Sequence, residues 1–587
     1  MATAEQATEQ LRVTFVHCPD PTYADTQNYG AQFMPVWAYT LAAHIPQDGR
    51  FALQLHDTRV QTLDDVPASD VFLFSGINQD HGNLMRVRAA LKALFPDAVS
   101  IIGGPICWSF NQAGDVAKLD GFDHIFIGDG EEQITELLES VRTGTPLAPV
   151  IQNKERFDLT KSRHMFRPLM DPTIHRYYGA VLEVSRGCPF LCEFCDIRIL
   201  PDNNRSHVKS PQLLIEELDH LCKLGVRQVL LACDNFIGDP KWANEVLDAL
   251  LEWQARTGQR PSLYTWLTIN LYKQRELMRK MRRAGFDMVF IGVESFNANS
   301  LLETAKVQNA AVSVAETVRE IQSYGFIVVG GLIFGFDSDD DAAFDITLQG
   351  LHDAGMLSGD PSLLTALPGT PLHRRMKLAG RMRDVRYGLG GFKYQTNIKY
   401  LMPTDKMIAG YKYFVEQFCT GRKQYARLKV FFDNLDRGNF VPIEGAGYGN
   451  VGLFLKMILR NPAATKQMLT RLFRFASRPR DVYWAMRGLG LALSRRGRVR
   501  GALGYFQFWF FAWTNSVLKY RNLSARDFDI ASIEGAYGPE HILPVEYDQD
   551  VKEDIPAAKT KDQLRSTTAQ LRSLIEQRFA SSGSRSD

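Results

Sequence analysis

The stretch VLEVSRGCPFLCEFCD, residues 181–196, decides how this chain is interpreted. It starts as an apolar, strand-like run and continues directly into three cysteines within eight residues, Cys188, Cys192 and Cys195. A structural zinc site takes four ligands, and an ordinary iron–sulfur cluster is held by four cysteines. Three cysteines on one loop therefore predict a metal centre with one open coordination position, which is what a catalytic centre keeps.

The alternative for this loop is a zinc site completed by a distant fourth ligand. Cys222 and His207 are the nearest residues in sequence that could supply it. The remaining cysteines are scattered along the chain, which argues against a disulfide framework. These are Cys18, Cys107, Cys222, Cys233 and Cys419.

The cysteine loop follows the first strand of a repeating pattern. Apolar runs at 181–187, 226–235, 262–270, 287–295, 326–336 and 361–370 alternate with amphipathic helical patterns. Six such units predict a (β/α)6 partial barrel of the TIM type, in which chemistry sits at the carboxyl ends of the strands. Any one polar residue there could merely cap a helix, but all six predicted ends carry polar or special residues, which favours a site. They are Cys188, Asp234, Asn235, Thr268, Asn270, Glu294, Ser295, Gly335, Asp337 and the run from Thr365 to Thr370.

A separate strand–helix series precedes the barrel. Runs at 12–17, 51–57, 71–76, 99–104 and 124–130 read as strands with helical segments between them. Such a pattern predicts a doubly wound parallel sheet of the α/β class, whose ligand crevice lies beyond the carboxyl ends of the strands. Glycines at those ends either admit a ligand close to the backbone or simply make tight turns, and as a set they favour a ligand. The residues concerned are Ser75, Gly76, Gly103, Gly104, Gly128 and Gly130.

The overall composition is that of a globular protein of several domains. The chain has 587 residues, is 45% hydrophobic and 23% charged, and has a formal net charge of +2. The start lacks a signal-peptide pattern and no apolar run reaches the ~18 residues of a membrane span, so we expect a cytoplasmic protein. The predicted division is 1–145 for the first α/β domain, 146–180 for a linker, 181–400 for the barrel, 401–545 for a mainly helical C-terminal domain and 546–587 for a polar tail.

The C-terminal region combines a basic stretch with an aromatic one. Residues 456–500 hold twelve Lys or Arg and one acid, Asp481, and YFQFWFFAW follows at 505–513. One interpretation is a solvated basic face beside a buried aromatic helix. The other is a surface that meets an anionic membrane or an apolar substrate. The barrel shows no basic stripe with interleaved aromatic residues, so we do not expect a nucleic-acid partner.

The Cys-x3-Cys-x2-Cys loop after the first barrel strand, with Phe194 before the last cysteine, resembles that of the radical S-adenosylmethionine (SAM) superfamily. The resemblance implies a 4Fe–4S cluster held by Cys188, Cys192 and Cys195, whose fourth iron binds SAM, and reductive cleavage of SAM to a 5′-deoxyadenosyl radical. LLACDNF, IGVES and GGLIFGF resemble the superfamily's segments around the SAM amino group, ribose and adenine, and LTALPGTPL resembles its sixth-strand segment. They imply SAM contacts from these strand ends: Phe194, Asp234, Thr268, Asn270, Glu294, Ser295 and Gly335.

The order of domains resembles the cobalamin-binding group of the superfamily. CPFLCEFCDI, DNFIG, IGVES and LLTALPGTPL are similar to the branch of hopanoid methylases and anaerobic tetrapyrrole-modifying enzymes, and the resemblance covers roughly residues 10–520. It implies cobalamin bound at the glycine-rich strand ends of the first domain. One departure is the segment DTQNYG, residues 25–30, in which Gln27 stands where many cobalamin domains have the histidine that ligates cobalt.

The resemblance implies cobalamin-dependent C-methylation of an unactivated carbon on a hydrophobic small molecule or lipid, with an external electron donor of the flavodoxin or ferredoxin type. Cobalamin-assisted cyclisation, ring contraction or oxidation without methyl transfer is a second hypothesis. A non-enzymatic iron–sulfur redox protein is a third. We assign no residue as a catalytic acid or base.

Overall fold

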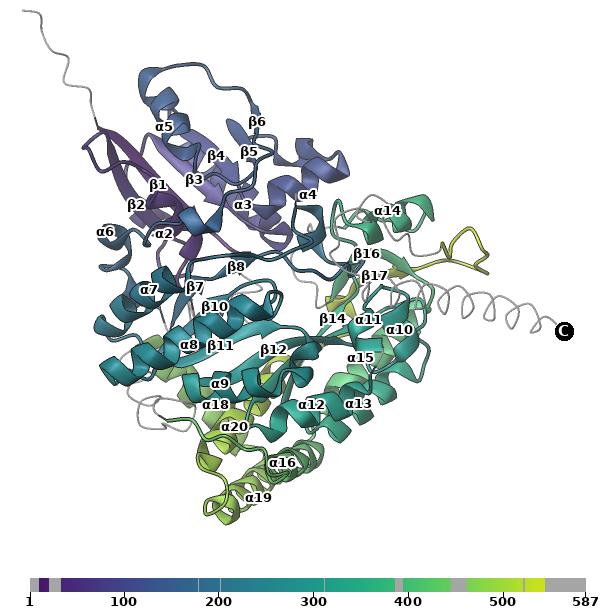
Figure 1. Ribbon diagram of the computed structural model, residues 1–587. Coiled ribbons are helices and arrows are strands. Elements are labelled where there is room, and N and C mark those ends of the chain that lie inside the picture. The colour runs from purple at the N-terminus through teal and green to yellow at the C-terminus, as the bar shows by residue number, and fades with distance from the viewer. Residues whose placement is uncertain are drawn as a thin grey trace, which may run out of the picture.

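The computed structural model describes residues 10–20, 33–177, 179–200, 202–310, 312–385, 394–444, 462–520 and 523–543. Within them the chain forms two six-stranded parallel sheets and a helical region that follows (Figure 1). Gln27 and the rest of DTQNYG lie outside the described residues, as do Lys456 and the tail from 544 on.

The first sheet has the strand order β2-β1-β3-β4-β5-β6, and every pairing in it is parallel. The central strands are buried almost throughout because helices cover both faces, which explains their continuous apolar sequences. The sixth strand lies beyond residue 145, where the sequence places the end of the first domain. The strands are Leu11–His17 (β1), Phe51–Asp57 (β2), Val71–Ser75 (β3), Val99–Gly103 (β4), His124–Ile127 (β5) and Val150–Gln152 (β6), and the main helices are Val36–Ala42 (α2), His81–Leu94 (α3), Pro105–Ala113 (α4) and Ile134–Thr143 (α5).

The second sheet has the order β14-β13-β12-β11-β10-β7, again with parallel pairing throughout. No pairing between β14 and β7 closes it within the described part of the chain, so the (β/α)6 partial barrel is confirmed. Its strands are Ala180–Glu183 (β7), Gln228–Ala232 (β10), Ser262–Leu267 (β11), Phe286–Glu294 (β12), Ile327–Phe334 (β13) and Ser358–Leu363 (β14).

Amphipathic helices cover the outside of the barrel. In α8, Pro240–Thr257, the residues Trp242, Val246, Leu250 and Trp253 recur on one side and are all buried against the sheet. The other helices of this layer are Pro211–Lys223 (α7), Arg275–Ala284 (α9), Ala298–Leu302 (α10), Val307–Ala310 (α11), Val314–Ser323 (α12), Ala343–Ala354 (α13) and Pro371–Leu378 (α14).

Short elements surround the cysteine loop and the linker. A two-stranded antiparallel ladder of β8, Ser185–Arg186, and β9, His207–Val208, brackets the loop. The linker contains α6, Arg167–Met170. The 3₁₀ helices are Leu63–Asp65 (η1), Asn78–Asp80 (η2), Val116–Leu119 (η3), Leu159–Lys161 (η4), Ile174–Arg176 (η5), Asp196–Ile199 (η6), Ile269–Lys273 (η7) and Ala525–Asp527 (η8).

The C-terminal region is mainly helical, as the sequence predicts, and packs at the lower end of the barrel in Figure 1. Its aromatic run forms part of α20, in which Trp509 and Trp513 are fully buried in a core shared with α16 and α19. The described part of α20 is therefore a buried helix. The elements are Gln395–Tyr400 (β16), Thr404–Cys419 (α15), Gly421–Leu435 (α16), Pro462–Ala476 (α18), Pro479–Arg495 (α19), Ala502–Tyr520 (α20) and Asp529–Ser532 (β17), which pairs with β16.

None of the described helices is both long and apolar enough to cross a membrane.

Candidate active site between the two sheets

A cavity of about 380 Å³ lies where the carboxyl ends of the two sheets face each other. One wall is formed by the ends of β3, β4 and β5 and the loops after them. The other wall is formed by the ends of β7 and β10 with the residues that follow. The cavity therefore brings together strand ends of both series, but of the barrel residues predicted for the site only Asp234 lines it, and Cys188, Cys192 and Cys195 do not. Of the predicted residues, its lining includes Ser75, Gly103, Gly104, Gly128, Gly130 and Asp234.

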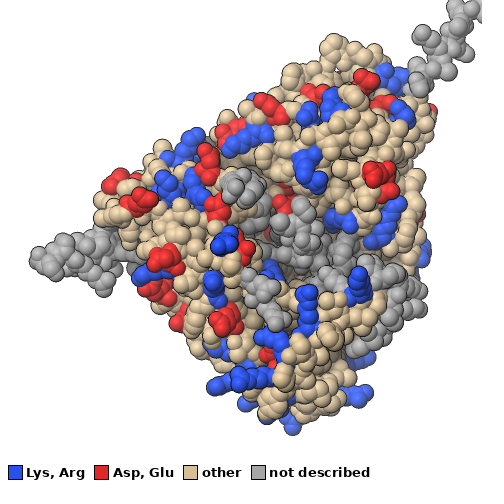
Figure 2. Space-filling model, turned by 180° about the vertical axis from the view of Figure 1, so that it is seen from behind, with Lys and Arg blue, Asp and Glu red and all other residues tan. Residues whose placement is uncertain are grey.

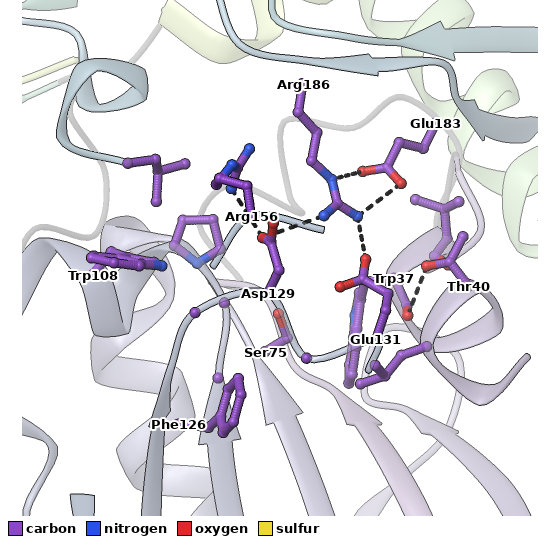
Figure 3. Close-up of a pocket in the computed structure, with 18 of the residues that line it drawn as sticks. Trp37, Thr40, Ser75, Trp108, Phe126, Asp129, Glu131, Arg156, Glu183 and Arg186 are labelled. Carbon is purple, nitrogen blue, oxygen red and sulfur yellow. Dashed lines mark hydrogen bonds and ion pairs between the residues drawn. The ribbon is translucent and has the colours of Figure 1, made fainter. Parts of the chain in front are cut away.

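Large aromatic side chains line the same cavity. Trp37 comes from α2, Trp108 from α4, Phe126 from β5 and Trp266 from β11 (Figure 3 shows the first three). Their rings make most of the cavity lining apolar, which suits a flat or hydrophobic ligand. Sequence reasoning missed these residues because each reads as an ordinary core position of a helix or strand.

The glycines at this edge are not equivalent. A Cβ on Gly103 would meet only the Phe126 carbonyl oxygen, at 3.8 Å, so its small size is not required by the surrounding protein. Gly104 has φ 86°, and a Cβ there would lie 2.4 Å from the Ser75 hydroxyl, so the turn itself demands glycine. Gly128 is similarly constrained by the Asn153 carbonyl oxygen at 2.4 Å. Gly103 is thus the position where the absence of a side chain serves the cavity.

Gly76 and Gly130 differ in the same way. A Cβ on Gly76 would lie 2.6 Å from Leu84, so packing of α3 explains this glycine without a ligand. Gly130 has no atom closer than 3.6 Å to such a Cβ and belongs to the cavity lining.

A network of ion pairs crosses the cavity from one sheet to the other (Figure 3). Arg186, just after β7, donates to Glu183 at 2.8 Å and to Glu131 of the first domain at 2.5 Å, and it lies 3.3 Å from Asp129. Arg156 of the linker donates to the same Asp129 at 3.0 Å. Burial alone would lower the pKa of Arg186, but Glu183 and Glu131 beside it raise that pKa well above its ordinary value. The network ties the first domain to the mouth of the barrel.

The cysteine loop starts at this mouth. The Gly187 amide donates to the Asp234 carboxylate at 2.6 Å, and the Cys188 amide donates to the Asn203 carbonyl oxygen at 2.9 Å. Gly187 has φ 92°, and a Cβ there would lie 2.0 Å from the Arg205 carbonyl oxygen, so only glycine fits. Burial, with the nearby Glu183 carboxylate adding to it against the Gly187 hydrogen bond, raises the pKa of Asp234 to about 6.

The three thiols are close enough to influence one another. Burial raises the pKa of Cys188 to about 11, and the neighbouring Cys192 adds to the effect. Burial, with Asp196 and Cys192 close by, raises the pKa of Cys195 well above its usual range. A bound metal centre stabilises the thiolate form of such cysteines.

The zinc alternative gains no support from the fold. Within the described residues, no three His, Cys, Asp or Glu side chains converge on one metal-ion position. Cys222 is buried in α7, and the His207 imidazole bonds the Asp202 carbonyl oxygen at 2.7 Å.

Buried polar atoms without partners surround the cysteine loop. The Ser185 hydroxyl, the Asn203 side-chain amide nitrogen and the Thr268 hydroxyl are each buried and bond nothing in the described structure. Ser185 and Asn203 also line the cavity. Since buried polar atoms are normally satisfied, their concentration here indicates a polar ligand that completes them.

A buried ion-pair chain holds the cysteine loop from behind. Glu193, between Cys192 and Phe194, accepts two hydrogen bonds of 2.7 Å from the guanidinium of Arg375 on α14. Arg375 also lies 3.5 Å from Asp337, and Asp337 accepts from Arg381 at 2.6 and 2.8 Å. All four side chains are at least nine-tenths buried. The sequence alone gave no signal for this pairing because its partners lie far apart along the chain.

The remaining predicted SAM contacts lie on the barrel side. Glu294 ends β12 with φ 63° and forms a buried ion pair with Lys306, whose ammonium lies 5.7 Å from the centre of the Phe194 ring. Thr268 immediately precedes η7, and Asn270 lies within it. Glu294 is thus linked through Lys306 to the cysteine loop.

Ser295 and Gly335 have local structural roles. The Ser295 hydroxyl accepts the Asn297 amide at 3.0 Å, as a turn-capping serine does. Gly335 has φ 103°, and a Cβ there would lie 2.6 Å from the Tyr400 ring. The turn therefore explains Gly335 on its own.

Comparison with known proteins agrees with this architecture. Residues 182–350 match the model of the radical SAM superfamily, and residues 370–489 match a domain of unknown function (DUF4070). The hopanoid C-2 methylase of Rhodopseudomonas palustris (strain TIE-1) is 31% identical over 388 residues, which are 65% of this chain and 70% of that protein.

A more distant relative and a solved structure extend the comparison. The anaerobic magnesium-protoporphyrin IX monomethyl ester cyclase of Synechocystis sp. is 22% identical over 318 residues, 51% of this chain and 61% of that protein. The structure of the cobalamin-dependent SAM radical enzyme OxsB, with aqua-cobalamin and SAM bound, superposes with a TM-score of 0.54 at 14% identity, over 96% of this chain and 84% of that one. At that identity the likeness concerns the fold. The chain belongs to the radical SAM superfamily, in the branch of the hopanoid C-2 methylase.

Proposed function

We propose that this radical SAM enzyme is a cobalamin-dependent C-methyltransferase acting on a hydrophobic small molecule or lipid. The observation that carries the proposal is the cavity between the carboxyl ends of the two sheets, walled by glycine-ended strands on one side and by the strand leading to the cysteine loop on the other. When bound, the cluster and SAM supply a 5′-deoxyadenosyl radical, and cobalamin supplies a methyl group.

The protein's own part is to hold these groups and to keep water away from them. Cys188, Cys192 and Cys195 hold the cluster, and the Glu193–Arg375 pair fixes the backbone between them. Asp234 orients the start of the loop through Gly187 and would bind the SAM ammonium group. Further SAM contacts come from Phe194 and from the ends of β11, β12 and β13: Thr268, Asn270, Glu294, Ser295 and Gly335.

Cobalamin is proposed for the wall formed by the first domain. The open space beside Gly103 and Gly130 and the indole of Trp108 fit one face of a flat ring system. Ser75, Gly104 and Gly128 also line this wall and are proposed for the same group, whereas Gly76, which does not line it, is proposed only for the turn after Ser75. The proposed division follows the sequence prediction, with cobalamin binding in 1–145, a linker at 146–180, the radical SAM core in 181–400, a helical domain in 401–545 and a tail from 546, except that β6 extends the first sheet to Gln152.

The partners of the reaction are part of the proposal. A single-electron step needs an external donor of the flavodoxin or ferredoxin type. A lipid-soluble substrate favours peripheral contact with a membrane surface, with the enzyme otherwise in the cytoplasm.

The experiment uses anaerobically reconstituted full-length protein with hydroxocobalamin, SAM and a reductant. We expect about four irons and about one cobalamin per chain, formation of 5′-deoxyadenosine, and a product heavier by one methyl group with a hopanoid-type lipid. If no 5′-deoxyadenosine forms, radical cleavage of SAM is excluded, and a non-enzymatic iron–sulfur redox protein is the remaining hypothesis.

The relationship to the magnesium-protoporphyrin cyclase favours one other reaction, radical cyclisation or oxidation without methyl transfer. That reaction also forms 5′-deoxyadenosine but leaves the mass of the product without the added methyl group. Product mass therefore separates the two enzymatic proposals.

A further inference from the structure

Two helices of the C-terminal region, α18 and α19, expose large apolar side chains to solvent, whereas α20 is buried. On α18, the Phe473 side chain is 79% exposed, and on α19 Met486 is 60% exposed. Large apolar side chains at such exposure are unusual when they recur on neighbouring helices. We name the exposed residues of the two helices the α18–α19 face: Leu469, Leu472, Phe473, Tyr483, Met486 and Leu493.

The spacing of these residues shows that they form stripes. Leu469, Leu472 and Phe473 follow the i, i+3, i+4 pattern of one helix side. Phe475, at the edge of the α18 stripe, and Ala485 and Ala492, on the other side of α19, are buried in the core shared with α20. Helices that pack on one core through these residues turn their other sides to solvent. The α18–α19 face is therefore the outer surface of this region.

Positive charge surrounds the face. Residues 456–500 contain one acid, Asp481, which is buried and paired with Arg478 at 2.9 Å. Arg495 is held by Asp433 at 2.8 Å and by Asp436. Arg487 is exposed and donates to the Tyr483 hydroxyl at 3.1 Å. Six more cations are exposed, and no ion pair involves them in the part of the chain that the structure describes: Lys466, Arg474, Arg480, Arg496, Arg498 and Arg500. Figure 2 shows blue side chains gathered at the lower end of the molecule, with few red ones among them.

We propose that the α18–α19 face docks on the surface of an anionic lipid bilayer. Exposed Phe, Leu, Met and Tyr side chains suit the boundary between headgroups and acyl chains, and unpaired cations beside them suit anionic headgroups. The inference places the membrane contact of the proposed function on a defined surface, and it moves that contact from the aromatic run at 505–513 to the two helices before it.

An acidic electron donor is a poorer occupant of this face. The Tyr505 hydroxyl of α20 donates to the Gly325 carbonyl oxygen at 2.7 Å, two residues before β13 begins. The C-terminal helices thus pack at the amino ends of the barrel strands, whereas the cysteine loop lies at the carboxyl ends. A donor bound to α18 and α19 would be separated from the cluster by the length of the barrel.

The test is sedimentation of the full-length protein with vesicles of phosphatidylglycerol and phosphatidylcholine, compared with phosphatidylcholine alone. We expect binding to the anionic vesicles that weakens as salt is added. The triple change Arg496→Glu, Arg498→Glu and Arg500→Glu should weaken the partition constant at least about a hundredfold, since each cation contributes separately. Phe473→Ser with Met486→Ser should weaken it about tenfold or more.

The control variants make the same kinds of substitution, charge reversal or loss of an apolar side chain, on helices outside the α18–α19 face. Lys223→Glu, Lys241→Glu and Arg275→Glu reverse three exposed cations on α7, α8 and α9, and Leu378→Ser removes an exposed leucine on α14. Both controls should bind vesicles like the unchanged protein. SAM cleavage by every variant should also be unchanged, so loss of cleavage would count against the proposed function and not against the docking face.

Three results would overturn the proposal. The first is equal binding to anionic and neutral vesicles, or binding to neither. The second is equal weakening by the α18–α19 variants and their controls. The third is concentration-dependent dimerisation that Phe473→Ser abolishes, because the face would then meet a second copy of the chain.

Discussion

The two parallel sheets meet at one cavity but contribute to it in opposite ways. On the first sheet, β3 and β4 end in Ser75 and Gly103, so this wall offers backbone and open space beside its aromatic rings, and its carboxylates Asp129 and Glu131 are engaged in ion pairs with Arg186. The barrel ends its strands in cysteine, carboxylate and hydroxyl groups, so its wall offers ligands and charge. The difference teaches that the same topology can hold one group by shape and another by coordination, depending only on which residues follow the strands.

The largest effect is expected on the barrel side. Changing Cys188, Cys192 or Cys195 to Ala should abolish both SAM cleavage and stable iron binding, because three thiolates are the whole protein contribution to the cluster. Iron content and 5′-deoxyadenosine formation are the measurements. Cys222→Ala is the matched control and should keep both, and an equal loss there would mean that the three-ligand assignment is wrong.

The next effect should be confined to the first sheet. Gly103→Leu adds a side chain at a position that lines the cavity, and only one protein atom lies within 4 Å of the added Cβ. We expect cobalamin affinity to fall about a hundredfold or more while iron content and SAM cleavage persist, as measured by the cobalamin spectrum after gel filtration. Gly490→Leu, at an exposed helical glycine with open space around it, is the control. Loss of the cluster in Gly103→Leu would contradict the assignment of cobalamin binding to the first sheet and cluster binding to the barrel.

The ion-pair chain behind the cysteine loop should show a smaller effect. Arg375→Ala leaves Glu193 buried without its partner, which costs about 3–5 kcal/mol of folding free energy. We expect a lower thermal midpoint and a shifted electron paramagnetic resonance signal of the reduced cluster, since the loop loses its fixed position. Arg375→Lys should restore part of the thermal midpoint but less of the paramagnetic resonance signal, because lysine cannot make the bidentate contact with Glu193. An unchanged signal in Arg375→Ala would show that the pair is only structural.

The smallest effect is an opposite response of the two sheets to pH. Burial and the nearby Arg59 lower the pKa of His17, at the end of β1, to about 4, so its contribution to stability grows as pH rises from about 4 to 6.5. Burial, against hydrogen bonds from Gly335 and Ser300, raises the pKa of Asp339, after β13, to about 6. Its contribution is therefore full near pH 4 and is lost as pH rises through 6.

Single variants isolate the two contributions. Between pH 4 and 6.5, His17→Gln should lose less stability on acidification than the unchanged protein, and Asp339→Asn should lose more. Amide hydrogen exchange in β1 and in the residues after β13 measures each region separately. The same pH slope in both variants would mean that neither group titrates as its surroundings indicate.

The sequence predicts the architecture better than it predicts the lining of the cavity. Both parallel sheets, the partial barrel and the helical C-terminal region follow from the spacing of apolar runs, and the structure confirms them. Two strands are exceptions: β6 is short and largely exposed, and β14, with the sequence SGDPSL, begins at Ser358 and ends at Leu363, so it overlaps the predicted run at 361–370 only at its end. Trp37, Arg156 and Arg186 could not be found in this way, because their role depends on how the first domain sits against the barrel.

Residue type alone also does not distinguish glycines and serines that line a ligand cavity from those that only form a turn. Gly76, Ser295 and Gly335 have adequate explanations in packing and capping, whereas Gly103 does not. The distinction rests on what a Cβ would meet, and that information is absent from a sequence. Asp129 lies in the predicted run 124–130 and Glu131 directly follows it, next to Gly128 and Gly130. Their position in the sequence could therefore have identified both as residues of the cavity.

The ion-pair chain behind the cysteine loop has a consequence for the order of events during synthesis. Arg381 and Arg375 also donate to the carbonyl oxygens of His541 and Leu543, at 3.3 and 3.4 Å, so the last described segment closes over the chain that begins at Glu193. That segment leaves the ribosome roughly 350 residues after Glu193, which at 5–20 residues per second is a delay of roughly 20–70 s. For that interval the loop is made but incompletely supported, and iron delivered early meets thiols whose surroundings are still open. Assembly of the cluster is therefore expected to be a late, post-translational event.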